Sequence, residues 1–125
     1  MKALILKEAG VDPAFDLVEL DDPSVSEDGV VLKVEAVGVC HHDISVMDGT
    51  LRRGVKDDVI LGHEIAGTVV DVGLSATGIK LGDKVVTTLT TSCGLCDTCL
   101  SGLEYRCPQA RGFGHGIDGG FAEYI

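Results

Sequence analysis

Short apolar segments rich in Val, Ile and Leu recur along the chain, and turn residues separate them. The clearest segment is residues 30–37, where Lys33 and Glu35 are interleaved with valines. Runs of roughly four to eight residues with this composition are typical of β-strands. We therefore expect strands at residues 2–7, 15–20, 30–37, 64–72 and 84–89, with one more strand beginning at 121–125.

Glycine and acidic residues mark the connections between these segments. Gly10 punctuates the first turn, residues 21–29 form an acidic loop, and residues 82–83 turn into the last full strand. Residues 41–48 could form one or two helical turns, which Gly49 would end. Many short strands with glycine turns and little helix predict a mainly β fold, an antiparallel barrel or sandwich.

A glycine-rich run at residues 112–120 has glycines like those of nucleotide-binding turns. However, neither a helical pattern nor a βαβ unit follows it. A nucleotide-binding fold is therefore not encoded in these 125 residues. We expect His115, which lies inside this run, to be exposed to solvent.

Length and charge narrow the classes of function. A chain of 125 residues is one domain by length and can bury roughly two-thirds of the surface of its unfolded form. Aromatic residues make up only 4%, so the core must be built from Val, Leu, Ile and Ala. The formal net charge is −10, and the only basic cluster is Arg52-Arg53, which we interpret as a solvated surface. This excess of negative charge argues against nucleic-acid and anionic-membrane partners.

The N-terminal segment contains too short an apolar run for a signal peptide, and no segment approaches the roughly 18 apolar residues of a membrane span. Cysteines that stay reduced are typical of the cytosol. We therefore expect a cytoplasmic protein with no membrane partner.

Four of the five cysteines form a ladder with two residues between the first three and seven before the last. Thiolate sulfur suits Zn²⁺, and such short loops let several sulfurs reach one tetrahedral ion. Two disulfides, a redox pair and an iron–sulfur cluster are the alternatives, but the even spacing favours one common centre over separate pairs, and ferredoxin spacings differ. A closed site of this kind is structural, and its ligands would be Cys93, Cys96, Cys99 and Cys107.

A second metal site is a weaker prediction. Cys40 ends one expected strand and His63 precedes another, so the two side chains could converge on an open zinc site, with Glu64 as the nearest further ligand. The alternatives are that the lone Cys is a small buried hydrophobe and the lone His a structural residue.

Five segments together resemble the zinc-dependent medium-chain alcohol dehydrogenases over practically the full length of the chain. The resemblance is to their N-terminal GroES-like catalytic domain. It implies a mainly β, partly open β-barrel at 1–125 with short helices, a four-cysteine zinc-binding lobe at 93–107, and no Rossmann cofactor domain. The segments are Val37–Asp43, Leu61–Glu64, Gly82–Val85, the cysteine ladder and Gly119–Tyr124.

The resemblance implies roles for individual residues. Cys40 and His63 would be ligands of a catalytic zinc, and Glu64 matches the acid that can approach or exchange onto the metal. Asp43 matches the carboxylate that holds the other ring nitrogen of the His ligand. The alternative for Asp43 is a helix N-cap, and one carboxylate can do both.

Two neighbouring histidines complete this set. His42 departs from the family, because better-known members have Ser or Thr there to begin a proton relay, and an imidazole can also carry a proton near neutral pH. His41 occupies the position that often contacts the pyrophosphate of the cofactor. For both histidines an ordinary surface role is the alternative.

The chemistry that the resemblance implies is oxidation of a small-molecule alcohol, or reduction of a carbonyl, with NAD or NADP. Family members take a third ligand of the catalytic zinc, and a Rossmann domain, from sequence that these residues do not contain. The chain ends within the strand expected at 121–125, so we expect it to be a portion of a longer enzyme, without turnover by itself. The assembly state stays open, a homo-oligomer included.

Two other classes of function remain as alternatives. A non-enzymatic zinc-binding GroES-like module would explain the missing cofactor domain, but it has no need of Cys40, Asp43, His63 and Glu64 together. A redox switch would rest on the cysteine ladder alone.

Overall fold

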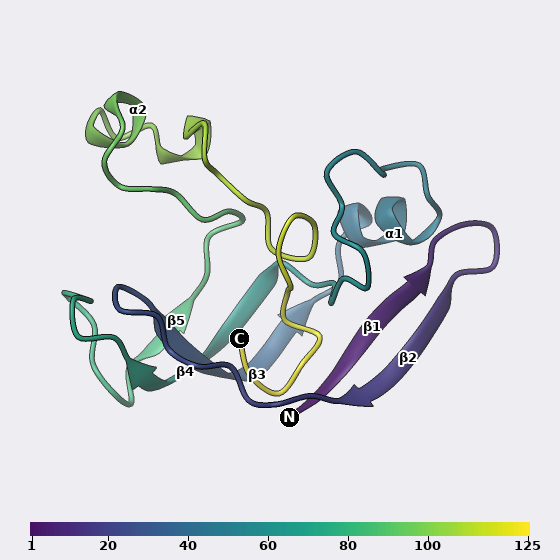
Figure 1. Ribbon diagram of the computed structural model, residues 1–125, viewed down its shortest axis with the longest axis horizontal. Helices are drawn as coiled ribbons and strands as arrows, with labels where there is room; N and C mark the ends of the chain where they lie inside the picture. The colour runs from purple at the N-terminus through teal and green to yellow at the C-terminus, as the bar shows by residue number, and fades with distance from the viewer.

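The computed structural model describes residues 1–125 and consists of two small antiparallel sheets (Figure 1). In the first, β1 (Lys2–Glu8) pairs with β2 (Ala14–Glu19). In the second, β4 (Glu64–Val72) lies between β3 (Val30–Gly38) and β5 (Lys84–Val86). All five strands fall within two or three residues of the predicted ranges, and the mainly β fold is confirmed.

The C-terminal segment 121–125 joins the two sheets. On one side the Leu4 N–H donates to the Phe121 carbonyl, and on the other the Leu32 N–H donates to the Ile125 carbonyl. The segment forms isolated bridges with β1 and β3 rather than a regular strand. A further isolated bridge pairs Ile5 with Ile60, and no closed barrel forms, which agrees with the partly open barrel that the resemblance implied.

The helices are short. α1 spans His41–Met47 and confirms the helical turns expected at 41–48, while α2 (Asp97–Leu100) and the 3-10 turn η1 (Glu104–Arg106) lie in the cysteine-rich region. None of these helices has the length or the apolar character needed to cross a membrane.

The predicted strand at 84–89 is too long by three residues, because the structure ends β5 at Val86. The Thr87 N–H still donates to the Ile65 carbonyl, but the chain then leaves the sheet toward the cysteine-rich lobe. The prediction extended the strand to Leu89 on apolar composition alone. In the structure Leu89 is exposed, and it has no strand partner that would hold it in the sheet.

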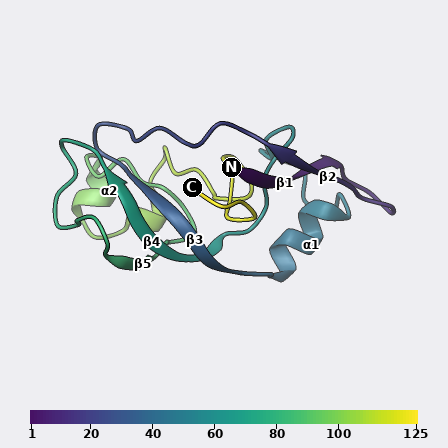
Figure 2. The same cartoon turned by 90° about the horizontal axis from the view of Figure 1, so that it is seen from below.

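A cluster of buried core residues lies where α1 meets β1. Leu6, Val46, Val59 and Leu61 are all buried, and they come from β1, α1 and the segment leading into β4. Figure 2 shows α1 packed beside the β1–β2 sheet. Burial of these aliphatic side chains, worth roughly 1.5–3 kcal/mol each, fixes the start of α1 relative to the residues before β4. The candidate residues Cys40, Asp43 and His63 lie beside this junction.

Candidate metal centres

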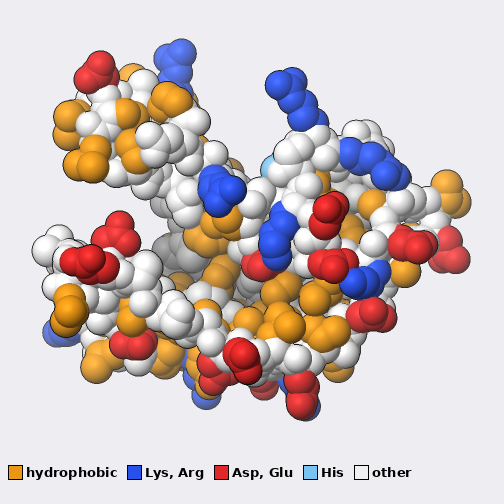
Figure 3. Space-filling model, in the orientation of Figure 1, with side chains coloured by type: hydrophobic (Ala, Val, Ile, Leu, Met, Phe, Trp, Pro, Cys, Tyr) orange, Lys and Arg blue, Asp and Glu red, His pale blue; other side chains and the backbone are white.

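The cysteine-rich segment forms a lobe, residues 93–107, that projects away from the sheets (Figure 1). Gly94 has φ of +69°, a value that glycine adopts without strain, and it allows the chain to turn tightly between Cys93 and Cys96. α2 then places Cys99 on the inner side, where it is buried. In Figure 3 the lobe is a separate protrusion with hydrophobic side chains on its surface.

The four sulfur atoms of this lobe lie at the distances that one metal ion requires. Their Sγ atoms are 3.5 Å apart for Cys96 and Cys99, 3.6 Å for Cys93 and Cys107, and 3.9 Å for Cys93 and Cys99. Four sulfurs placed tetrahedrally about 2.3 Å from an ion are about 3.8 Å apart. All five cysteines are free thiols in the structure, so the arrangement fits a metal and not two disulfides.

Hydrogen bonds in the lobe favour thiolates over thiols at some positions. The Cys96 N–H donates to Cys93 Sγ (3.4 Å), and the Cys93 N–H donates to Cys107 Sγ (3.5 Å). The contact with the Thr98 hydroxyl lowers the pKa of Cys96 to about 6, while burial raises the pKa of Cys99 to about 12. A divalent cation at the centre would favour the thiolate form of all four.

The second cluster follows from strand pairing. β3 and β4 are antiparallel, and Gly38 at the end of β3 pairs with Glu64 at the start of β4. Cys40, two residues after Gly38, therefore comes close to His63 and Glu64. One ligand atom from each of these three residues lies within 4.8 Å of the others. His63 is buried and Glu64 is exposed, so the cluster sits at the edge of the interior.

The Asp43 carboxylate accepts two backbone N–H groups and lies beside the His63 ring. Its Oδ2 accepts the Cys40 N–H at 2.9 Å, which caps the start of α1, and its Oδ1 accepts the Gly62 N–H at 3.0 Å. The same Oδ1 is 3.7 Å from Nδ1 of His63, and the side chain is fully buried. The N-cap residue of α1 is Cys40, so the expectation that Asp43 is itself the N-cap is wrong; Asp43 is the third residue of the helix, and its carboxylate accepts the N–H of the N-cap residue while it also stands beside the imidazole.

The His42 ring stands edge-on to the His63 ring, with centroids 4.8 Å apart and planes at 89°. One ring nitrogen of His42 lies within 4.8 Å of ligand atoms of Asp43 and His63. Burial lowers the pKa of His42, and the nearby His63 and His115 lower it further. The neutral imidazole is therefore favoured near pH 7, the form that can accept a proton or bind a metal. By contrast, His41 is exposed on the outer side of α1.

The prediction that His115 is exposed to solvent is wrong. The ring is half-buried, its centroid is 5.3 Å from that of His42, and its Nε2 lies 3.0 Å from the Arg53 carbonyl oxygen. The reason is that the glycine-rich run folds back on the main chain. A Cβ at Gly114 would lie 2.9 Å from the Gly62 nitrogen, so only glycine allows this approach. In the sequence, the five glycines within 112–120 were the feature that could have indicated such close backbone contact.

These groups line one cavity of about 540 Å³. Cys40, His42, His63 and Glu64 lie on one side of it, and Phe113 and His115 on the glycine-rich run lie on another. A cavity of this size with a few convergent polar groups is the usual form of a small-molecule site. The remaining lining residues are Leu89, Thr90 and Gly112.

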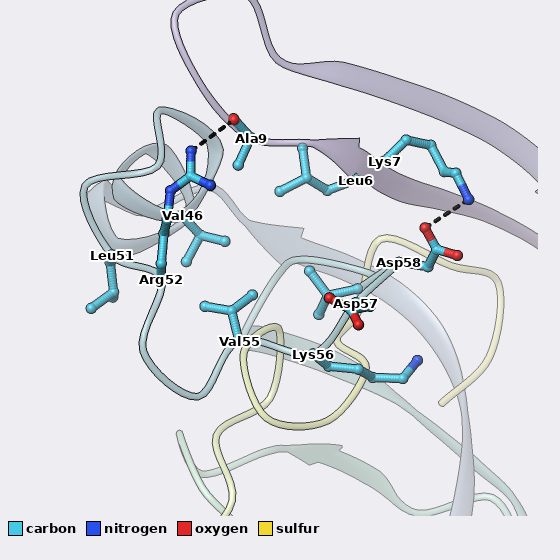
Figure 4. A pocket seen from close by; sticks show the side chains of 11 residues that line it. Leu6, Lys7, Ala9, Val46, Leu51, Arg52, Val55, Lys56, Asp57 and Asp58 are labelled. Carbon is cyan, nitrogen blue, oxygen red and sulfur yellow. Dashed lines mark hydrogen bonds and ion pairs between the residues drawn. The ribbon is translucent and has the colours of Figure 1, made fainter.

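A second hollow of about 410 Å³ lies between β1, α1 and residues 51–59 (Figure 4). Its floor is aliphatic, and its cations are already engaged within the chain. Lys7 pairs with Asp58 at 2.6 Å, and the Arg52 guanidinium donates to the Ala9 carbonyl at 3.0 Å. We find no metal-ligating cluster there.

Comparison with a family model places most of the chain in a described family. Residues 26–125 match the model of the alcohol dehydrogenase GroES-like domain. Among curated relatives, an alcohol dehydrogenase of Geobacillus stearothermophilus is 39% identical over 99% of this chain. An L-threonine 3-dehydrogenase of Streptomyces coelicolor is 36% identical over 100% of it. The chain spans about a third of the length of these two relatives, 36% in each case.

Comparison with solved structures points to the same family. A thermostable alcohol dehydrogenase from Pyrobaculum aerophilum, solved with cobalt and zinc bound, superposes with a TM-score of 0.87 at 31% identity, covering 100% of this chain and 38% of that one. An NAD-dependent alcohol dehydrogenase gives a TM-score of 0.87 at 29% identity, covering 100% of this chain and 36% of that one.

Proposed function

Because this chain belongs to the family of alcohol dehydrogenase GroES-like domains, we propose that it supplies the substrate-side half of a zinc-dependent alcohol dehydrogenase active site. The observation that carries this proposal is the convergence of Cys40, His63 and Glu64 on one cavity, with ligand atoms within 4.8 Å of each other. A Cys, a His and a carboxylate are a donor set that suits Zn²⁺ and leaves room for a further ligand.

Each residue then has a defined task. Cys40 and His63 hold the catalytic zinc, and Glu64 stands beside it at the mouth of the cavity. A bound zinc supplies Lewis acidity toward an alcohol or carbonyl oxygen. Asp43 keeps the His63 ring in place, and His42 accepts or returns a proton within the cavity. We assign His41, on the exposed side of α1, to contact with the cofactor.

The cysteine lobe at 93–107 acts as a structural zinc site in this proposal. Its four thiolates fill the coordination sphere, so they leave no position for a substrate. A non-enzymatic module would need only this lobe, whereas the second cluster adds polar ligands around a cavity. That addition favours an enzyme.

For the complete enzyme we propose reversible oxidation of a small alcohol with NAD or NADP. The names of the relatives, an alcohol dehydrogenase and an L-threonine 3-dehydrogenase, support alcohol substrates. These 125 residues hold no Gly-x-Gly-x-x-Gly turn leading into a helix, so we expect no turnover from them alone. Five free cysteines are compatible with a reducing cytoplasm.

Zinc content tests the proposal. The chain purified without added metal is expected to hold close to two zinc ions, as measured by elemental analysis, and Cys40→Ser should hold close to one. His41→Ala, an exposed neighbour of the cluster, is the matched control and should keep both ions. A wild-type content near one that Cys40→Ser leaves unchanged would contradict a metal role for Cys40.

A further inference from the structure

The cysteine lobe is joined to the rest of the chain by two short segments that lie side by side, residues 89–91 before it and residues 111–113 after it. We call this pair of segments the stem. The first segment leads into Cys93 and the second follows Cys107, and the sulfurs of these two cysteines are 3.6 Å apart. The Cys93 N–H also donates to Cys107 Sγ at 3.5 Å. A metal ion bound by the lobe therefore connects the two segments at the outer end of the stem.

The stem has few hydrogen bonds of its own. The Phe113 N–H donates to the Leu89 carbonyl at 3.2 Å, and the Thr91 N–H donates to the Arg111 carbonyl at 2.9 Å. The Arg111 N–H in turn donates to the Thr91 hydroxyl at 3.2 Å. An isolated pair of strands is only marginally stable in water, so these bonds alone do not fix the stem.

The inner end of the stem forms one wall of the cavity that contains the Cys40–His63–Glu64 cluster. Four of the nine residues that line this cavity belong to the stem: Leu89, Thr90, Gly112 and Phe113. Leu89 is 62% exposed and Phe113 is half-buried, so both apolar side chains are available to a ligand. The same short element therefore carries the lobe at one end and borders the cavity at the other.

The inner end of the stem is anchored separately on each side. The Thr87 N–H donates to the Ile65 carbonyl of β4, while the Gly112 carbonyl accepts the N–H groups of Gly116 and Ile117 within the glycine-rich run. These anchors do not join the two segments to each other. When the connection at the outer end is lost, the segments can separate while the sheets keep their places.

From this geometry we propose that the stem is the substrate-selecting wall of the cavity, and that the lobe thiolates set the position of this wall by holding a metal ion at its outer end. The proposal rests on the function proposed above, because it concerns the same cavity. Leu89 and Phe113 contact the apolar part of an alcohol whose oxygen faces Cys40 and His63. Loss of the lobe metal then weakens substrate binding without removing a ligand of the catalytic cluster.

Binding of benzyl alcohol to the zinc-loaded chain tests the proposal, because its ring is of a size to contact Leu89 and Phe113 in a cavity of about 540 Å³. The dissociation constant is measured by NMR titration. The signals followed are the backbone amides of Cys40 and Glu64, which line the cavity outside the stem.

The double variant Cys93→Ser/Cys107→Ser removes the connection at the outer end of the stem. Elemental analysis should show that it loses one zinc ion and keeps the other. We expect its dissociation constant for benzyl alcohol to rise at least about 10-fold, because the wall is no longer ordered before binding. Amide exchange at Thr91 and Phe113 should also be faster, since both N–H groups donate across the stem.

Three single variants separate wall position from damage to the lobe. Thr91→Val removes the hydroxyl that accepts the Arg111 N–H and leaves every thiolate in place, so we expect both zinc ions and about 3-fold weaker binding. Thr91→Ser keeps an acceptor hydroxyl and should bind like the wild type. Leu100→Ala, at a side chain of the lobe that is 73% exposed, is the matched control and should also bind like the wild type.

The outcomes distinguish this proposal from the proposed function. Wild-type affinity in the double variant, with the lobe zinc absent, would overturn the control of the wall by the lobe and leave the proposed function standing. Absence of benzyl alcohol binding in the wild-type chain with both zinc ions in place would overturn it as well. A wild-type zinc content near one that Cys40→Ser leaves unchanged counts against the proposed function, and it is measured from metal content and not from probe binding.

Discussion

Replacement of Cys99 by Ser is expected to remove one zinc ion per chain and to unfold the lobe at 93–107. Cys99 is buried, and its sulfur lies 3.5 Å from that of Cys96 and 3.9 Å from that of Cys93. Metal binding contributes on the order of 10–16 kcal/mol to the folding of small zinc peptides. The lobe depends on such binding, because Leu95, Leu100 and Tyr105 are more than 70% exposed and provide little core.

Hydrogen exchange and elemental analysis check this expectation together. Amide protection should be lost over residues 93–107, while the β3–β4 pairs keep theirs, since the lobe projects from the sheets. Cys40→Ser is the matched control, because it removes a thiol outside the lobe and should leave lobe protection intact. Full lobe protection in Cys99→Ser, or in chelator-treated protein, would show that the lobe folds without metal.

The second large effect is expected from Asp43→Ala. This substitution leaves the N–H groups of Cys40 and Gly62 without acceptors in the interior, where each unsatisfied group costs about 1–3 kcal/mol. We expect the free energy of unfolding to fall by about 2–5 kcal/mol, measured by denaturant titration. Zinc affinity at the Cys40–His63 cluster should fall about 10- to 100-fold, because the His63 ring loses the group beside it.

Two further variants serve as controls for the Asp43→Ala result. Asp43→Asn keeps an acceptor oxygen of nearly the same shape, so its loss of stability should be clearly smaller. Asp48→Ala removes an exposed acid of the same region, whose Oδ1 accepts the Thr50 N–H, and should change stability by less than about 1 kcal/mol. Equal effects of Asp43→Ala and Asp48→Ala on stability would contradict the role given to the buried carboxylate.

Several features were predictable because they depend on local sequence. Interleaved valines and charged residues specify β3, and the spacing of four cysteines specifies their convergence, since short loops restrict where each sulfur can go. The end of β5 was not predictable in this way. Leu89 looks like a strand residue by composition, but strands need a partner, and β4 offers none to it.

The sequence by itself therefore determined the strands apart from the end of β5, the short α1 and the cysteine ladder, because each follows from residue type and spacing over a few positions. The sequence allowed Cys40, His63 and Glu64 to converge, but only the tertiary structure decided the geometry in which distant side chains meet. The β3–β4 register brings Cys40 to Glu64, the glycine-rich run folds His115 against His42, and Asp43 reaches the Gly62 N–H. These contacts join residues far apart in the chain, and they depend on the packing of whole elements, which no local pattern encodes.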